Sequence, residues 1–230
     1  MKNCFSMTFN GLEFLFPKRT ISFTHGFGIV KGLYEDVIED EYYIKEPLIG
    51  VVDQNFKPVI SLFPERMLGK IEFLNDKVIF IQLKESLKEE GYQVYQINYL
   101  NGEPDVLVLP GLDFFPISSN IVKIKSKSES GMGMLESLYD VSKAKFVSDQ
   151  FHFIDSFHYD EERKEMVAEV TYFLPYDENR ANQIITHINL KGEVISSYFD
   201  VDQDKYYASD LDLEDIFSSI MDDMKTKMSR

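Results

Sequence analysis

Three aspartates near the end of the chain are spaced like the first ligands of a calcium-binding loop. Asp200, Asp202 and Asp204 alternate within DVDQDKYYASD, and alternating carboxylates can converge on Ca²⁺ because this hard cation prefers oxygen ligands. Two positions depart from such a loop: Lys205 replaces the glycine that permits its sharp turn, and Leu211 replaces the glutamate that closes it. We therefore interpret these aspartates as solvated acids, and we expect no metal and no cofactor.

A second acidic stretch combines carboxylates with aromatic rings. In EDVIEDEYY the carboxylates could pair with Lys or Arg of a partner while tyrosine supplies rigid contact area. The residues that we expect to bind a partner are Glu35, Asp36, Glu39, Asp40, Glu41, Tyr42 and Tyr43. The alternative is that this stretch is a solvated strand edge or connecting loop.

The other motifs point to no defined reaction. The chain has no nucleophile elbow, no Walker loop and no zinc-binding helix. The glycines of HGFGIVKG lack the context of a dinucleotide-binding turn and indicate a β-turn region, and KIKSKSESGMGM (123–134) is interpreted as a long exposed loop. Paired carboxylates are too numerous to choose among, so a glycoside-acting enzyme stays open.

The charge of the chain limits its partners. Acidic residues outnumber basic ones by 39 to 24, which gives a formal net charge of −15. Such a field repels phosphate backbones and anionic membrane surfaces and attracts basic surfaces. We expect neither nucleic acid nor a membrane as partner, and we expect that a protein partner would be basic.

Cysteine content and hydropathy favour a cytoplasmic protein. Cys4 is the single cysteine, so no disulfide can form within the chain, which suits a reducing compartment. The first residues lack the apolar run of a signal peptide, and no stretch approaches the roughly 20 apolar residues needed to span a bilayer.

Nearly the same five residues occur twice, as LFPKR at 15–19 and LFPER at 62–66. Their prolines, Pro17 and Pro64, are 47 residues apart, and Pro110 follows 46 residues later in a similar context. A turn precedes each proline: Asn10-Gly11, Asn55-Phe56-Lys57-Pro58 and Asn101-Gly102. Because proline donates no amide hydrogen, we expect each to lie where a strand leaves its sheet.

Two weaker copies extend this repeat. The equivalent turn positions are Gly11, Phe56, Gly102, Lys143 and Gly192. Asn-Gly tolerates the positive φ of a two-residue hairpin loop, and the flanking apolar alternation is typical of strands. Further strand-like runs between the hairpins, among them SNIVKIKSK (119–127), give about four strands per 45 residues, as in a propeller blade. The sequence thus predicts an all-β, propeller-like array.

One repeat resembles a known family. The stretch GVVDQNFKPVI (50–60) is similar to the tryptophan-glycine (WG) repeat, with a glycine, two aliphatic residues, an aspartate, a polar turn and a basic residue. It departs from that pattern because Ile49 stands in place of tryptophan and Phe56 in place of the turn glycine. The resemblance implies an array of β-units that serves as an interaction surface.

The end of the chain has helical periodicity. Leu213, Ile216, Phe217, Ile220 and Met224 fall on one helical face. Acids lie in the first turn and lysines in the last, which matches the helix dipole. We expect residues 1–208 to form the β-repeat domain and 209–230 a helix packed on it.

These observations favour a non-enzymatic acidic protein that docks a protein partner, in concrete form an inhibitor or toxin-immunity protein. One alternative is an enzyme or small-ligand binder that uses a central propeller pocket. Another is a structural subunit of a larger assembly, with the terminal helix as its docking element.

Overall fold

The computed structural model describes residues 3–38, 42–84, 91–128, 133–176, 180–201 and 204–206. At 36–38, 42–44, 173–176, 180–184, 196–201 and 204–206 it describes the backbone alone. The chain forms two compact units, Met1–Ser126 and Lys127–Arg230, and each is considered by itself. The helix predicted over 209–230 lies outside the described residues.

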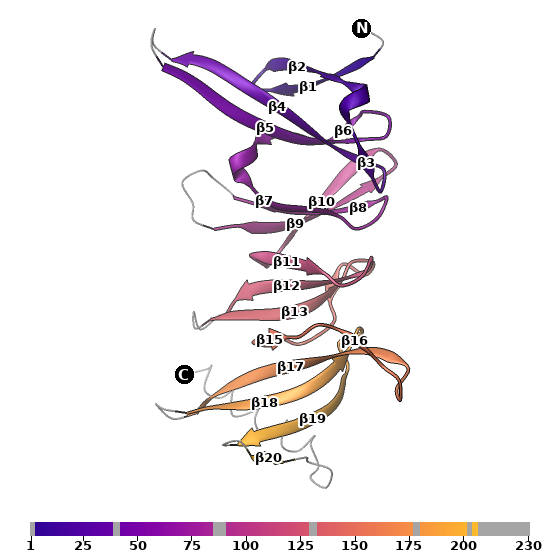
Figure 1. The fold of residues 1–230 in the computed structure, drawn as a ribbon, viewed down its shortest axis with the longest axis vertical. Helices are drawn as coiled ribbons and strands as arrows, with labels where there is room; N and C mark the ends of the chain where they lie inside the picture. Colours follow the sequence, from indigo (N-terminus) through magenta and orange to yellow (C-terminus); the bar gives the residue numbers. More distant parts are fainter. Residues whose placement is uncertain are drawn as a thin grey trace. The chain divides into compact units, whose positions relative to one another are not determined.

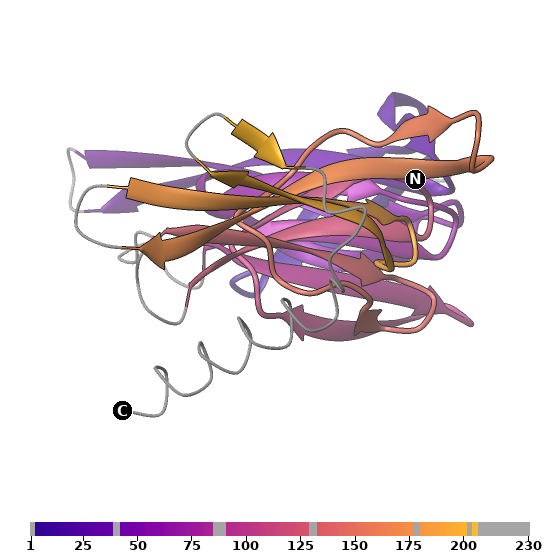
Figure 2. The same cartoon turned by 90° about the horizontal axis from the view of Figure 1, so that it is seen from below.

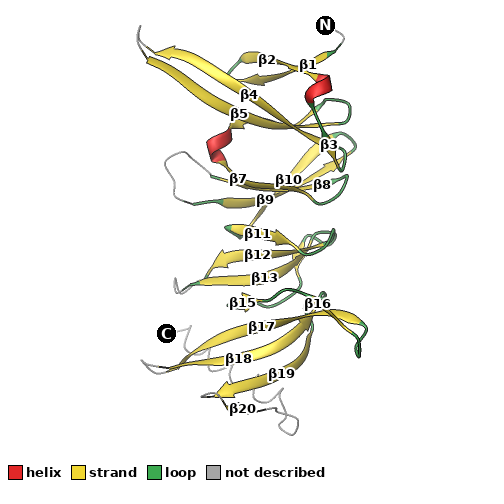
Figure 3. Ribbon diagram, in the orientation of Figure 1, coloured by secondary structure: helices red, strands yellow, loops and turns green. Residues whose placement is uncertain are grey.

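The chain is an all-β, propeller-like array of antiparallel sheets, as predicted (Figures 1 and 3). Sheet A contains β1 (Cys4–Phe9) and β2 (Leu12–Pro17). Sheet B contains, in order, β3 (Phe23–Thr24), β4 (Phe27–Ile38), β5 (Tyr42–Asp53) and β6 (Pro58–Pro64). Sheet C has the order β10-β9-β8-β7, with β7 (Leu68–Phe73), β8 (Val78–Leu83), β9 (Gln93–Leu100) and β10 (Glu103–Leu109).

Two further sheets follow along the chain. Sheet D contains, in order, β11 (Asp113–Pro116), β12 (Ile121–Lys127), β13 (Met134–Asp140) and β14 (Lys145–Phe146). Sheet E contains β15 (Phe153–Ile154), β16 (His158–Asp160), β17 (Glu165–Tyr176), β18 (Arg180–Asn189), β19 (Val194–Val201) and β20 (Asp204–Tyr206). Both β15 and β16 pair with β17, and Figure 2 shows β17, β18 and β19 side by side in orange to yellow.

All five predicted turns are confirmed as hairpin turns, one in each sheet. In the β1–β2 turn, Asn10 and Gly11 have φ of 49° and 78°, and in the β9–β10 turn Asn101 and Gly102 have φ of 55° and 80°. Both central residues therefore adopt the left-handed conformation that a type I′ hairpin requires. This is why Asn-Gly predicted these hairpins correctly.

The repeated LFP motif ends a strand in both copies. Pro17 ends β2 and Pro64 ends β6, and each caps a three-residue 3₁₀ helix, Lys18–Thr20 or Glu65–Met67. Their φ angles are −69° and −57°. Because proline has no N–H to donate to a neighbouring strand, the chain can leave the sheet at these positions. The predicted role of these prolines is confirmed.

In the first unit, sheet B lies between sheets A and C, and a separate apolar core fills each of its faces (Figure 1). The core shared with sheet A contains Met7, Phe16, Val30, Leu48, Val52 and Leu62. The core shared with sheet C contains Phe27, Val51, Val59, Ile79, Ile81 and Ile97. Successive residues of β5 alternate between these cores because side chains of a strand point to opposite faces. Each sheet thus shields its neighbour's apolar face, as the repeat predicted.

In the second unit, a buried carboxylate joins two parts of the chain. Glu136 of β13 is 4% exposed, and its Oε2 accepts the backbone N–H of Ile154 at 2.8 Å. Its backbone also forms a bridge with Phe151. A buried carboxylate is tolerated only with such partners, so Glu136 fixes the 151–154 segment against β13.

One part of the sequence-based prediction is wrong. Residues 123–134 were expected to form a loop, but β12 extends through Lys127 and β13 begins at Met134. The lysines of KIKSK alternate with Val122 and Ile124, which are buried, so this segment is a half-buried strand with polar residues on its other face.

Candidate protein-docking hairpin

The hairpin formed by β4 and β5 extends beyond the other strands of sheet B (Figure 1). Its strands pair from Phe27 and Asp53 at the base to Ile38 and Tyr42 at the outer end. In contrast, β3 pairs only with the first two residues of β4, and β6 pairs with β5 only over 48–52. Among the described strands, the outer part of the hairpin is therefore a two-stranded ribbon. We call residues 31–38 and 42–47 the β4–β5 arm.

Sheet A anchors the base of this arm. A Cβ placed on Gly32 would lie 3.3 Å from the ring of Phe16, so the absence of a side chain at Gly32 allows this ring to approach β4 closely. The rings of Phe9 and Tyr34 meet edge to face at 5.6 Å. Since an isolated two-stranded ribbon is marginally stable in water, these contacts help to hold the arm in place.

Two ion pairs lie along one face of the arm. Glu35 and Lys45 lie directly opposite each other, and Lys45 Nζ is 2.9 Å from Glu35 Oε1. Lys31 Nζ is 2.6 Å from Glu65 Oε1. Both pairs are largely exposed, so each contributes at most about 1 kcal/mol to stability. Lys31 and Glu35 also place opposite charges on the same face of β4.

A less exposed ion pair lies on the other strand of the arm. Arg66 Nη2 is 2.6 Å from Glu46 Oε2, and the Glu46 side chain is only 11% exposed. Removal of Arg66 would leave a poorly hydrated carboxylate without its partner. The 3₁₀ helix Glu65–Met67 therefore fixes β5 at the point where the arm begins.

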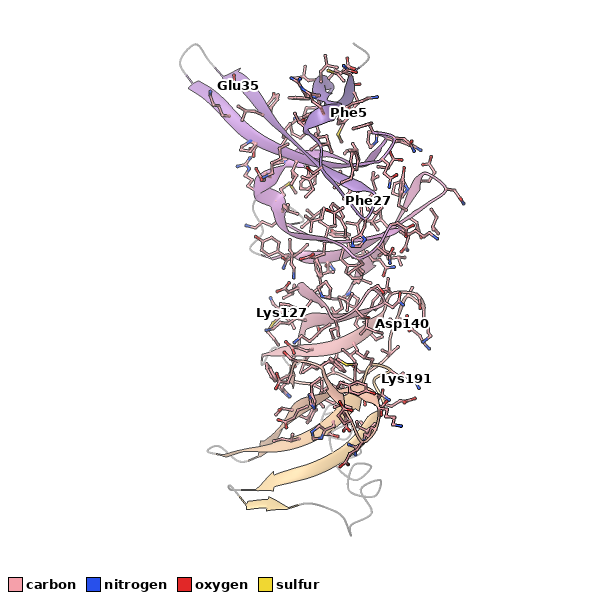
Figure 4. The ribbon with its side chains drawn as sticks, turned by 45° about the vertical axis from the view of Figure 1, so that its right-hand side comes forward. Phe5, Phe27, Glu35, Lys127, Asp140 and Lys191 are labelled. Atoms are coloured by element: carbon pink, nitrogen blue, oxygen red, sulfur yellow. The ribbon has the colours of Figure 1, made fainter. Side chains whose placement is uncertain are left out.

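The structure describes only part of the predicted partner-binding cluster. Glu35 is described in full and lies at the outer end of β4 (Figure 4). The backbones of Asp36, Tyr42 and Tyr43 belong to β4 and β5, whereas Glu39, Asp40 and Glu41 lie outside the described residues. The cluster therefore brackets the connection between the two strands.

Strand register divides this cluster between two faces. Residues directly opposite each other share a face, and successive residues alternate. Residue 37 is opposite 43 and residue 36 is opposite 44, so Tyr43 is placed on the face of Glu35 and Tyr42 on the face of Asp36. The sequence alone could not show this division because it depends on the hairpin register.

At the base of the same hairpin, a carboxylate contact joins sheets B and C. Asp53 Oδ1 accepts the N–H groups of Asn55 and Lys57, each at 2.8 Å, and Asp53 Oδ2 accepts the hydroxyl hydrogen of Tyr99 at 2.9 Å. Burial, with the nearby Asp53 carboxylate, raises the pKa of Tyr99 to about 12. Sequence reasoning identified Asp53 as part of the repeat but had no signal for its partner Tyr99.

The calcium-like stretch forms a hairpin in the structure. Asp200 is opposite Lys205 and Val201 is opposite Asp204, while Asp202 lies outside the described residues. In the part of the chain that the structure describes, no group of three His, Cys, Asp or Glu residues could hold a metal ion. Nor does any helix there have the length and apolar character needed to cross a bilayer.

Comparison with known proteins identifies no family. No family model matches the chain, and no curated protein matches it. The chain is similar to a solved structure described as the Dos1 propeller, with 17% identity and a TM-score of 0.34. The match covers 70% of this chain and 45% of that chain, so it spans less than half of the solved structure.

Proposed function

We propose that this chain is a non-enzymatic binding protein that docks a basic protein partner through the outer end of the β4–β5 arm, as an inhibitor or toxin-immunity protein does. The observation that supports this most is the place of the acidic segment. Glu35 and Asp36 lie near the end of β4, and residues 39–41 join the two strands of an arm that no other described strand flanks. Docking there would use carboxylates and tyrosines and would need no catalytic residue.

The charge of the chain supports the same proposal. With a net charge of −15, the protein accelerates encounters with a basic surface and slows encounters with nucleic acid. Binding to a basic partner should therefore weaken steeply as salt increases, because exposed charges are screened over about 8 Å at physiological ionic strength. We place the protein in the cytoplasm, where the exposed Cys4 would stay reduced.

A matched pair of variants tests this proposal. The arm variant Glu39→Gln, Asp40→Asn, Glu41→Gln removes three charges between the strands. The control Asp149→Asn, Glu161→Gln, Glu162→Gln removes three exposed charges elsewhere. Partners captured by the wild-type chain from its native source are identified by mass spectrometry, purified and titrated against both variants. We expect the arm variant to lose at least about tenfold in affinity and the control to lose little. Equal losses, or binding that salt does not weaken, would contradict docking at the arm.

We also propose that the repeat is a divergent relative of the WG repeat. This relation is supported by Asp53, whose side chain caps the turn at the position where the WG pattern has an aspartate. Sequences of close relatives test the relation: some should have tryptophan at the position of Ile49, and its absence from all of them would argue against it.

A further inference from the structure

One edge of β4 is unpaired along the arm. β5 pairs with the full length of β4 on one side, whereas on the other side β3 reaches only Phe27 and Gly28. From Lys31 to Ile38, no described strand pairs with this second edge. A strand edge exposes N–H and C=O groups that can pair with another strand, and natural proteins usually protect such edges.

A proline opposite β4 indicates which residues direct their backbone groups to this edge. In an antiparallel pair, alternate residues direct N–H and C=O toward and away from the partner strand. Pro47 has no N–H, so its place in the arm fits a position whose nitrogen points away from β4. Leu33 lies opposite Pro47 and shares that phase, so its N–H and C=O point to the unpaired edge. Lys31 and Glu35, two residues away on each side, do the same.

The order of residues on this edge is self-complementary. We propose that two copies of the chain associate by antiparallel pairing of β4 with β4, with Leu33 on the two-fold axis. In this register, Lys31 of one copy lies opposite Glu35 of the second, Glu35 lies opposite Lys31, and Leu33 lies opposite Leu33. Residues 31, 33 and 35 are also those whose backbone groups face the edge, so the hydrogen bonds and the side-chain pairs require the same register.

Exposure and charge favour a second copy as the occupant of this edge. Leu33 is 47% exposed, and the axis would place it against the same side chain of the other copy. Lys31 and Glu35 lie on the same face as Leu33, and each already contacts an opposite charge in its own chain, Glu65 or Lys45. Across the interface these groups would form a row of alternating charge, from Lys45 through Glu35 to Lys31 and Glu65 of the second copy. Such cross-strand pairs stabilise a sheet, whereas like charges there destabilise it.

Edge strand β10 provides a contrast. It also has exposed valines, Val106 and Val108, at 52% and 62%. Its sequence EPDVLVL contains no basic residue, so no antiparallel self-pairing brings opposite charges together. The β4 association does not depend on the proposed partner, because it is measured on the purified chain alone.

Sedimentation equilibrium over a range of concentrations is the first test. We expect a reversible dimer of the wild-type chain, and Leu33→Lys should raise its dissociation constant at least about tenfold because it places like charges on the axis. The control Val108→Lys adds the same residue at the β10 edge and should leave the dimer unchanged. A wild-type chain that is monomeric at concentrations on the order of 0.1 mM would overturn the proposal.

A charge exchange tests the register. Lys31→Glu places glutamate opposite Glu35, and Glu35→Lys places lysine opposite Lys31, so each single variant should weaken the dimer. The double variant Lys31→Glu, Glu35→Lys restores opposite charges across the axis and should recover most of the affinity. If the double variant is as weak as the single variants, the register is wrong.

A disulfide tests the position of the axis without a change of charge. In a Cys4→Ser background, Leu33→Cys should form a disulfide-linked dimer under mild oxidation, because hydrogen-bonded antiparallel pairs have Cα atoms about 5.5 Å apart. The matched variant Cys4→Ser, Val108→Cys has its thiol at a more exposed position of another sheet edge and should still crosslink more slowly. Equal crosslinking of the two variants would overturn the proposal.

Discussion

Two hairpin turns, one in each unit, have the same hydrogen bonds and a different residue at their most constrained position. In the β5–β6 turn, Asp53 Oδ1 accepts the N–H groups of Asn55 and Lys57, at 2.8 Å each. In the β18–β19 turn, Asn189 Oδ1 accepts those of Lys191 and Glu193, at 2.9 and 3.1 Å. In each turn the first residue's carbonyl also accepts a backbone N–H from the fourth, at 2.9 Å in both. The first side chain therefore defines the turn in both units.

The fourth residue of these turns has a positive φ, which is 64° for Phe56 and 78° for Gly192. Glycine adopts this conformation without strain, whereas phenylalanine does not. Phe56 is stabilised there by contacts with the rings of Phe5 and Phe23, at 5.1 and 5.5 Å. At Gly192 a Cβ would lie 2.1 Å from the carbonyl oxygen of Val147. The capping side chain thus determines the backbone conformation of the turn. The atoms around the fourth position determine which residue can occupy that position.

The largest effect is expected at the glycine turn. Gly192→Ala adds a methyl group that collides with backbone atoms, in addition to the strain of positive φ, and should destabilise the chain by about 4 kcal/mol. Gly11→Ala is a matched control because Gly11 has the same φ of 78° but no neighbouring heavy atom within 4 Å. It should cost only about 1 kcal/mol. Urea unfolding measures both, and equal losses would show that surroundings do not decide the residue.

The phenylalanine turn should respond in two separable ways. Phe56→Ala removes the aromatic contacts but keeps the strained backbone, and we expect a loss of about 3 kcal/mol. Phe56→Gly removes the same contacts and relieves the strain, so it should be about 1 kcal/mol more stable than Phe56→Ala. The difference between the variants in urea unfolding reports the strain. Should the glycine variant be the less stable of the two, the strain at Phe56 is negligible.

Local turn chemistry explains how much of the fold could be predicted. Asn10-Gly11 and Asn101-Gly102 need no tertiary contact to favour a hairpin, and a proline such as Pro17 ends a strand in any context. The strand at 121–127 lies within the strand-like run SNIVKIKSK (119–127), but the loop expected over 123–134 overlaps it, because that expectation gave more weight to the lysines of KIKSK than to buried Val122 and Ile124. A strand with one polar face resembles a loop when its apolar residues are few.

The candidate site was predictable in composition but not in geometry. Glu35 and Tyr43 were recognised as parts of one acidic and aromatic stretch, but the pairing of Glu35 with Lys45 depends on a register that only the folded hairpin defines. The contact between Asp53 and Tyr99 joins two sheets across 46 residues of sequence, and no local pattern signals it. Long-range pairs of this kind follow from the stacking of sheets, which a repeat pattern predicts only in general terms.

Acid should separate turns that are capped by a carboxylate from those capped by an amide. At the β13–β14 turn, burial opposes ionisation of Asp140. Hydrogen bonds from Lys143 and Ser142, together with the charge of Lys143, outweigh burial and lower the pKa of Asp140 from 3.8 to about 2. A lowered pKa stabilises the fold above the unfolded value, so about 2 kcal/mol should be lost as pH falls from about 4 to 2. In Asp140→Asn, the free energy of unfolding should change less with pH over this range. The cap at Asn189 is neutral, although its Nδ2 also donates to the Glu165 and Glu193 carboxylates. The cost of Asn189→Ala should therefore change less between pH 7 and pH 3 than the stabilisation by Asp140 does.

The second oxygen of Asp53 distinguishes its turn from that of Asn189. Tyr99→Phe removes the hydroxyl that donates to Asp53 Oδ2 and should cost about 1 kcal/mol at pH 7. Because the pKa of Tyr99 is raised from 10.0 to about 12, its stabilising effect is complete below pH 10 and is lost as pH rises toward 12. The wild-type minus variant difference in tyrosinate absorbance should therefore titrate near pH 12. A midpoint near 10 would show that Asp53 and burial do not hold the proton.

The smallest effect is expected where the same turn meets solvent. Lys57 Nζ is 2.8 Å from Glu103 Oε1 and also donates to the carbonyl of Gly102, but the two charged side chains are 49% and 78% exposed. Water and salt screen such a pair, so Lys57→Met should change the free energy of unfolding by only about 0.5 kcal/mol, less in high salt. The backbone N–H of Lys57 still reaches Asp53 in this variant, so the turn itself is intact. A loss comparable to that of Tyr99→Phe would mean that the exposed ion pair, as well as the tyrosine hydroxyl, joins the two sheets.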